Sequence, residues 1–324
     1  MSESGYNFIN YRYKYEELQE CESLDKLFHG LQQAFGSEFE QYEFVLYATN
    51  GSTNPAVPIK LTGDKKKVLI YISDEEMLVP YELCKDFVAI FKSLLPNDYD
   101  RERNMFPFPL APNRGTEELP IIPINKRPVN LFFSGNLNTK RYLLYKELTF
   151  LKNLPNFPPP LEKQVARVFS KLIKLYFKTN LSDTFPDSCI EFTGGYLQGN
   201  VKTFSQMLYD SKIAICPSGF YSPETCRHFE AMRAGCIVIS EPLPDHYCYT
   251  GSPMIFLDSW KDLRKTVESL LSDPDRLHEL HEKTLDWWEN VCSEKATALY
   301  IRDRVKDIEC STMQFSEKLS MQEF

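Results

Sequence analysis

Apolar and polar positions follow two distinct patterns along the second half of this chain. Short apolar runs rich in β-branched residues are separated by segments whose apolar residues recur every three or four positions. The first pattern is typical of buried strands and the second of amphipathic helices. Strands that alternate with helices favour an α/β fold with a doubly wound parallel sheet. The expected strands are 129–133, 189–192, 212–216, 236–240 and 254–257.

Helical spacing predicts the elements between and after these strands. The expected helices are 139–152, 161–177, 203–210, 222–234 and 260–271, followed by a long helical tail over 276–308.

The first half has a sparser pattern. Residues 23–35 and 80–94 have helical spacing, whereas 42–48 and 68–72 are apolar runs that we expect to be strands. The stretch 104–113 has too many prolines for a helix or a central strand.

At 324 residues the chain is longer than one core usually serves, so we expect two domains. Residues 114–128, charged and then proline-bearing, are the best linker candidate. We place an N-terminal domain at 1–118, a C-terminal domain at 119–275, a returning helix at 276–310 and a frayed tail at 311–324.

The segment 211–245 gives the clearest local signal, which predicts a strand, a loop, a helix and a second strand. Such a unit crosses over right-handed, so its strands are parallel and ligands bind beyond their carboxyl ends. Ser222 is expected to cap the helix, with Pro223 in the first turn and Gly235 at the end. The N–H groups of 222–225 would then suit a phosphate.

Several side chains near this segment are candidate ligands. Glu224, Arg227 and Glu230 are spaced by three, so they form a row on the expected helix. This row could be a set of surface ion pairs or part of a binding site. The Glu230 carboxylate could accept hydrogen bonds from two ribose hydroxyls, because the small residues Ala234 and Gly235 would let a ligand approach closely. Ser218 and Gly219 belong to the loop before the helix.

A second strand-to-helix turn carries Gly135, followed by the basic pair Lys140 and Arg141. These cations would point at the same sheet edge and could bind phosphate, or they could simply be solvated. Gly194 and the glycine after it, at a third strand end, could allow close backbone approach or could form only a turn.

Composition limits the classes of function. A net charge of −8 argues against a broad nucleic-acid surface, and no apolar run approaches the length that spans a bilayer. The N-terminus has no signal-peptide pattern, and the nine cysteines are scattered without metal-binding spacing. We therefore expect a cytoplasmic protein with reduced cysteines. His278 and His281 have a spacing that could bind metal, but no third ligand is in view, so we expect exposed histidines.

The stretch CPSGFYSPETCRHFEAMRAGCIVI closely resembles the exostosin-like glycosyltransferases, as does NLFFSGNLNTKRYLLYKEL for the preceding turn. The resemblance covers about residues 128–275. The matching positions are Cys216, Pro217, Gly219, Glu224, Thr225, Arg227, Phe229, Glu230, Ala231, Ala234, Gly235 and Cys236.

The resemblance implies a GT-B fold, with two Rossmann-like domains facing across a cleft, in a bacterial-type cytoplasmic member. It implies an inverting transfer from a nucleotide-sugar donor, most commonly a UDP-sugar, to a glycan or glycolipid in polysaccharide biosynthesis. Neither a cofactor nor a metal is implied. The C-terminal domain would hold the donor: Glu230 the ribose, and Thr225, Arg227, Lys140 and Arg141 the diphosphate. The partners are the two substrates, with peripheral membrane association open and oligomeric state undetermined.

The catalytic base would come from the first domain. Asp74 is our first candidate because it follows an apolar strand, and Glu75 is the second. Both could instead be solvated loop acids. Two other functions stay open: a nucleotide-sugar epimerase or hydrolase on the same fold, and a catalytically silent partner subunit.

Overall fold

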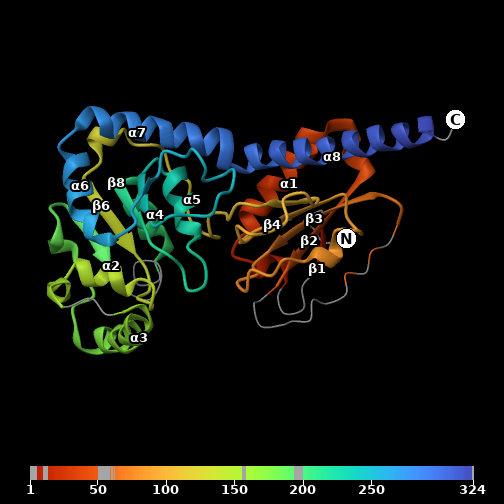
Figure 1. The fold of residues 1–324 in the computed structure, drawn as a ribbon. Helices are drawn as coiled ribbons and strands as arrows, with labels where there is room; N and C mark the ends of the chain where they lie inside the picture. Colours follow the sequence, from red (N-terminus) through yellow and green to blue (C-terminus); the bar gives the residue numbers. More distant parts are fainter. Residues whose placement is uncertain are drawn as a thin grey trace. The chain divides into compact units, whose positions relative to one another are not determined.

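The structure, a computed structural model, describes residues 6–9, 14–49, 59, 61, 63–154, 158–192 and 200–322 (Figure 1). The chain forms two compact units. Unit 1 contains 1–114, 246–248 and 291–324, and unit 2 contains 115–245 and 249–290. Each unit has one five-stranded sheet in which every neighbouring pair is parallel. The expected α/β class, with a parallel sheet in each of two units, is therefore confirmed.

The strands of unit 1 lie side by side in chain order. They are β1 (Asn7–Ile9), β2 (Tyr42–Ala48), β3 (Lys66–Ile72), β4 (Ala89–Lys92) and β5 (Met105–Pro107). Among the described strands, the proline-bearing β5 pairs with β4 alone, at the edge of the sheet, where a missing N–H disrupts no ladder.

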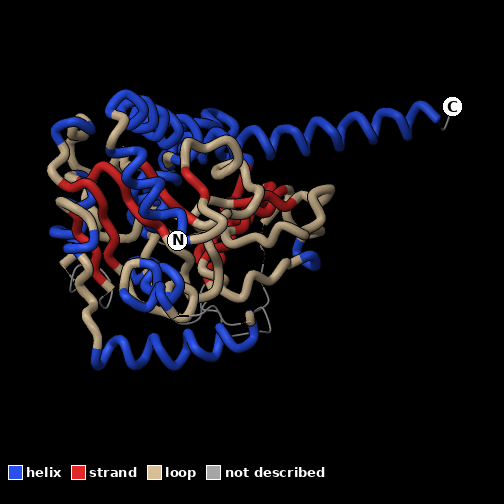
Figure 2. The backbone as a smooth tube through the Cα atoms, turned by 60° about the vertical axis from the view of Figure 1, so that its left-hand side comes forward, coloured by secondary structure: helices blue, strands red, loops and turns tan. Residues whose placement is uncertain are grey.

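Two helices cover one face of this sheet, α1 (Cys21–Phe35) and α8 (Glu294–Gln322). Phe44 and Leu46 point to that face, while Val45 and Tyr47 point to the other, as the period of two in a strand requires. At the helix crossing, a Cβ on Gly30 would lie 3.0 Å from the Ala298 side chain. Figure 2 shows α8 as one long helix that runs to the C-terminus.

The strands of unit 2 are β6 (Val129–Ser134), β7 (Ser188–Glu191), β8 (Ser211–Cys216), β9 (Ile237–Ser240) and β10 (Ile255–Phe256). The five predicted strands of this half are thus confirmed. Their order in space is β10-β9-β8-β6-β7. The chain moves from β6 to β7 and then returns to place β8 on the other side of β6. This reversal is a topological switch point, where open parallel sheets bind ligands.

Helices cover both faces of this second sheet. The helices are α2 (Tyr142–Glu147), α3 (Pro159–Tyr176), α4 (Val201–Tyr209), α5 (Cys226–Arg233), α6 (Leu263–Leu271) and α7 (Pro274–Trp287). Leu131, Phe133 and Ile213 pack with α2, α3 and α6. On the opposite face the ring of Phe132 lies 5.5 Å from that of Phe204 in α4. Alternate residues of β6 therefore serve two helical layers, as a doubly wound sheet requires.

The prediction of a helix over 80–94 is wrong. The segment forms a short 3-10 helix, Tyr81–Leu83, and then strand β4. Ala89–Lys92 is buried throughout, between β3 and β5, and a short apolar run does not by itself distinguish a buried strand from a helix.

Two other predicted helices are interrupted. The helix expected over 139–152 is α2 followed by a 3-10 helix, Phe150–Asn153, which Thr149 caps through its Oγ1 and the Leu151 N–H. The tail expected over 276–308 breaks at a π-helical turn, Trp288–Cys292. As a result α7 belongs to unit 2 and α8 to unit 1.

Candidate functional site

The switch point of unit 2 gathers five of the predicted binding residues, and we call them the switch-point cluster. They are Gly135, Lys140 and Arg141 after β6, and Ser218 and Arg227 after β8. The two sets are 77 or more residues apart in sequence, and the parallel pairing of β6 with β8 brings their carboxyl ends together.

Arg141 ties the two loops to each other. Its Nε donates to the Ser218 carbonyl at 2.9 Å, and its Nη1 donates to the Asn136 carbonyl at 2.9 Å. Its backbone N–H also donates to Asn138 Oδ1 at 2.9 Å. The side chain is only 5% exposed, so these oxygens hold a buried positive charge in one orientation.

Arg227 approaches from the other side. Its Nε donates to the Ser134 carbonyl at 2.8 Å, and its guanidinium lies 5.7 Å from the ring centre of Phe204. A Cβ on Gly135 would lie 2.8 Å from Arg141 Nη1 and 3.4 Å from Arg227 Nη2. The absence of a side chain at Gly135 is therefore what lets two guanidinium groups converge.

The convergence has an electrostatic cost. Burial, and next the charge of Arg227, lower the pKa of Arg141 to about 9. Burial likewise lowers the pKa of Lys140, whose Nζ donates to the Tyr221 carbonyl. Groups whose charged forms are disfavoured in this way gain most from a bound anion, since an anion offsets both burial and mutual repulsion.

Glu241 is a residue that the sequence did not single out. One carboxylate oxygen accepts the Ser218 N–H at 2.7 Å and the Ser218 hydroxyl, and the other accepts Trp260 Nε1 at 3.2 Å. It follows β9 directly, so its position after an apolar strand was the available signal. Its side chain fixes the loop that carries Ser218.

The helix after this loop starts later than predicted. Helix α5 begins at Cys226 with Thr225 as its N-cap, so the expected start at Ser222 is wrong. Ser222 instead closes a turn: its carbonyl accepts the Gly219 N–H at 2.9 Å, and its Oγ accepts the Glu224 N–H at 3.1 Å. The Thr225 N–H donates to His228 Nδ1 at 3.2 Å, so that donor is already engaged.

The tautomer of His228 follows from its neighbours. The Ser240 hydroxyl donates to the Cys216 carbonyl at 3.0 Å, so it accepts from His228 Nε2 at 2.8 Å. Nε2 therefore has the proton and Nδ1 accepts. Burial lowers the pKa of His228 to about 4, so the ring is neutral at pH 7. His228 is a helix-capping group.

Glu224 and Glu230 do not form the surface row considered from the sequence. Glu224 precedes the helix and is 5% exposed, and Glu230 lies within α5 and is 1% exposed. An exposed ion-pair ladder is thereby excluded. Both carboxylates are buried near the switch point, on either side of Arg227 in sequence.

The small residues after Glu230 serve packing. Gly235 has a φ of +70°, and a Cβ there would lie 2.8 Å from His281 Cε1 of α7. His281 Nδ1 donates to the Gly235 carbonyl at 2.7 Å. The Arg127 guanidinium, 2% exposed, donates to the carbonyls of Ser211 and Ala234 at 2.7 Å each. The absence of a side chain at Gly235 thus allows close packing of helix α7, whereas we expected it to allow close approach of a ligand.

The histidine pair on α7 is also different from the expectation. His278 is exposed, but His281 is 2% exposed, and burial lowers its pKa. Among the described residues, no group of three His, Cys, Asp or Glu side chains could hold a metal ion.

The candidate bases lie at the carboxyl edge of the other sheet. Asp74 is 2% exposed, and Lys92 Nζ, on β4, lies 2.9 Å from its Oδ2. The Asp74 carboxylate also accepts the N–H groups of Glu76 at 3.2 Å and Leu78 at 2.9 Å. Asp74 is therefore not a solvated loop acid, whereas Glu75 is exposed.

The remaining expectations from the sequence concern other regions. Gly194 lies outside the described residues. In the part of the chain that the structure describes, no helix combines the length and apolar character needed to cross a bilayer.

Comparisons with known proteins give only distant likenesses. No protein-family model matches the chain, and no curated protein matches it. A glycosyltransferase from Rickettsia africae ESF-5 superposes with a TM-score of 0.47 at 13% identity, over 93% of this chain and 84% of that one. The GtfA/B complex gives a TM-score of 0.41 at 12% identity, over 75% of this chain. This chain spans 57% of the length of the matched chain in that complex. Likeness of this degree assigns no activity, so the architecture rests on the strands described above.

Proposed function

We propose that this chain is a glycosyltransferase whose donor is a nucleoside-diphosphate sugar, bound at the switch-point cluster. One observation carries the proposal: Arg141 and Arg227 converge on Gly135 between the carboxyl ends of β6 and β8. A diphosphate is the ligand group that best matches two adjacent guanidiniums, because each can give paired hydrogen bonds to phosphate oxygens.

In this proposal Arg141, Arg227 and Lys140 would offset the negative charge of the diphosphate. Their charge would take the part that a metal ion plays at other phosphate sites, so the proposed site needs no metal. Ser218, Gly219 and Ser222 would shape the loop beside the diphosphate, since the N–H groups of Ser218 and Gly219 are already bonded within the protein. Glu224 and Thr225 would support that loop from within. Glu230 would take the ribose hydroxyls, as the family resemblance implies.

The proposed reaction is an inverting transfer from a UDP-sugar to a glycan or glycolipid hydroxyl. The acceptor oxygen would attack the anomeric carbon while a carboxylate takes its proton, and the diphosphate would leave with the bonding electrons. The guanidinium groups would stabilise the charge that develops on the leaving diphosphate.

The identity of the base is a separate proposal, and here the contacts favour Glu75 over Asp74. The Asp74 carboxylate is already committed to Lys92 and to two backbone N–H groups within unit 1. Glu75 is exposed and next to it in sequence. Glu75→Gln is expected to lower turnover by at least 10²-fold while leaving donor affinity unchanged.

Calorimetric titration with UDP, GDP, CDP, CMP and dTDP tests donor binding. One nucleotide is expected to bind the wild type, and Arg227→Gln is expected to lose most of that affinity. Glu230→Gln keeps the volume of a buried side chain, so it tests the ribose contact with less damage than alanine. Arg264→Gln, which removes an exposed arginine of α6, is the matched control.

Two outcomes would replace this proposal. If no nucleotide binds at millimolar concentration, the chain is a silent partner subunit and lacks donor chemistry. If the nucleotide binds and the donor sugar is changed without any acceptor, the chain is an epimerase or a hydrolase. Incubation of the donor alone, followed by analysis of the sugar, separates these results.

A further inference from the structure

Helix α3 of unit 2 has three faces of different character. Ala166, Ser170 and Ile173 are buried on one face, and the ring of Phe169 lies 5.8 Å from that of Tyr142 in α2. Figure 1 shows α3 at the margin of the unit, with α2 between it and the strands. On its other two faces, most of the side chains that the structure describes are exposed.

One open face is apolar. Leu161, Val168 and Leu172 are 44%, 55% and 38% exposed. Their spacings of seven and four residues place them in one row along an α-helix. We call the row of Leu161, Val168 and Leu172 the apolar ridge. Two further exposed rings belong to this unit: Phe177, just beyond the end of the helix, lies 6.1 Å from Phe150, which is 65% exposed.

The other open face is basic. Lys163, Arg167 and Lys171 are all exposed and are spaced by four, so they form a row beside the apolar ridge. None of these three has an ion-pair partner among the described residues. Residues 159–178 contain five basic residues and one acidic residue, in a chain whose net charge is −8. Helix α3 and the two residues after it thus have a local excess of positive charge.

We propose that α3 is a peripheral membrane-binding helix that docks on anionic lipid. An apolar ridge beside a basic row is the pattern of helices that lie in the plane of a bilayer surface. The ridge would enter the boundary between headgroups and acyl chains, and the lysine and arginine stems would extend to the lipid phosphates. Charge complementarity favours anionic lipid as the occupant. A purely apolar partner would match the apolar ridge alone, whereas an anionic lipid surface matches both the ridge and the basic row.

The docking surface lies on the same unit as the switch-point cluster. The charge of Lys163 contributes to the lowered pKa of Lys140, after the larger effect of burial and against the charge of Glu241. A docked helix would therefore hold that cluster close to the membrane surface. The inference itself does not depend on glycosyl transfer, and its test measures binding alone.

Co-sedimentation with vesicles tests the proposal. Wild-type protein is expected to pellet with vesicles of 70% phosphatidylcholine and 30% phosphatidylglycerol, and much less with phosphatidylcholine alone. Each basic residue near an anionic surface contributes about fivefold in affinity, so Lys163→Gln, Arg167→Gln and Lys171→Gln together should lower partitioning by about 10²-fold. Raised salt should weaken binding of the wild type.

Matched variants separate the surface from net charge and from general stickiness. Lys265→Gln, Arg276→Gln and Lys283→Gln together remove the same charge from exposed sites on α6 and α7, and they should leave partitioning nearly unchanged. Val168→Gln should lower it at least tenfold, whereas Phe256→Gln, at a site 40% exposed elsewhere in the unit, should not.

Three outcomes would overturn the proposal. Wild-type protein that does not pellet with anionic vesicles contradicts it, and so do equal losses in the charge variant and its control. The third is a dimer, measured by light scattering, that Val168→Gln converts to a monomer with no change in vesicle binding. In that case a second copy of the chain covers the ridge.

Discussion

The two sheets have the same parallel pairing but treat charge at their carboxyl edges in opposite ways. In unit 1, the cation of Lys92 has the carboxylate of Asp74 at 2.9 Å, and both side chains are almost fully buried. In unit 2, the hydrogen bonds of Arg141 go to two carbonyl oxygens, and Arg227 lies close by. The edge of unit 1 has a buried ion pair, whereas the edge of unit 2 brings two guanidinium groups together.

Strand order accounts for part of this difference. The strands of unit 1 follow chain order, so all its crossovers proceed in one direction. In unit 2 the order reverses between β6 and β8, and open parallel sheets bind ligands at such a reversal. A buried pair is suited to holding loops, whereas adjacent cations at a switch point are suited to an anion. Three non-glycine residues near the Asp74–Lys92 pair have positive φ: Ser73, Met77 and Leu94. This is consistent with a buried pair that holds the surrounding loops in fixed conformations.

The largest expected effect is on stability, and it tests the edge of unit 1. Asp74→Asn leaves the buried ammonium of Lys92 without a carboxylate, which should cost about 3–5 kcal/mol in the free energy of unfolding. Urea denaturation measures it. The double variant Asp74→Leu with Lys92→Met should be more stable than Asp74→Asn, since it leaves no buried charge. Equal stability of Asp74→Asn and wild type would show that the pair does not hold this edge.

The second prediction tests the edge of unit 2. Arg227→Gln removes a charge-assisted contact to the proposed diphosphate and should weaken nucleotide binding by about 2–3 kcal/mol, a factor of roughly 30–150. Calorimetry gives the affinity, and thermal denaturation should show that the unit stays folded. An unchanged affinity would move the anion site away from the switch-point cluster.

The third prediction concerns the convergence itself. In Gly135→Ala the new methyl group would lie 2.8 Å from Arg141 Nη1, so the guanidinium must shift. Nucleotide affinity should fall about tenfold, while stability changes little because Gly135 does not have a positive φ. Gly251→Ala, at a positive φ next to Trp287, is the opposite control: it should lose stability but keep affinity.

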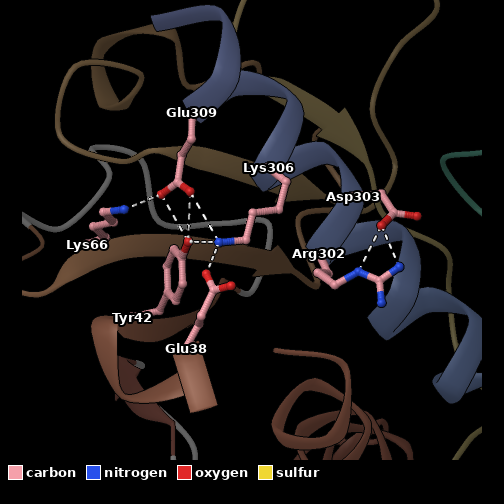
Figure 3. Close-up of polar contacts among 7 residues, drawn as sticks. All are labelled: Glu38, Tyr42, Lys66, Arg302, Asp303, Lys306 and Glu309. Atoms are coloured by element: carbon pink, nitrogen blue, oxygen red, sulfur yellow. Dashed lines mark hydrogen bonds and ion pairs between the residues drawn. The ribbon is translucent and has the colours of Figure 1, made fainter. Parts of the chain in front are cut away.

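The smallest effect comes from an exposed counterpart of the buried pair. In unit 1, Lys66 Nζ lies 2.6 Å from Glu309 Oε1, and the Tyr42 hydroxyl donates to the same carboxylate (Figure 3). Lys306 also contacts Glu309 at 3.4 Å and Glu38. Burial would raise the pKa of Glu309, but the hydrogen bonds from Lys66 and Tyr42 prevail and lower it.

A carboxyl whose pKa is lowered by folding stabilises the protein above its unfolded pKa, and that contribution is lost as pH falls through the folded pKa. Glu309→Gln should therefore cost about 0.5–1 kcal/mol at pH 7, a small value because the lysine partners are one-third to one-half exposed. The difference between variant and wild type should shrink as pH falls below the ordinary pKa of Glu, and it should vanish once Glu309 is protonated in the folded protein. A difference that persists after that protonation would mean that the cost is one of packing.

Local pattern was sufficient for most of unit 2. The runs around Phe132, Ile213 and Val238 are apolar on both faces because helices cover both, and such runs are readable in a sequence. The hydrophobic pattern gave a wrong prediction where contacts with residues distant in sequence determine the secondary structure. Residues 80–94 have helical spacing, but β3 and β5 accept Ala89–Lys92 as a strand. Helix α5 starts at Cys226, and not at Ser222 as predicted, because Thr225 and His228 form a capping box.

The candidate site divides in the same way. The sequence by itself determined that glycine, basic and hydroxyl residues follow β6 and β8, because a parallel strand always directs its following loop to the same edge. Only the tertiary structure decided that Gly135 admits two guanidiniums, that Glu241 fixes Ser218, and that Gly235 admits α7. The ion pair between Lys92 and Asp74 was likewise known only from the tertiary structure. These outcomes depend on distances between residues far apart in the chain, and hydrophobic periodicity reports only how each segment faces its own core.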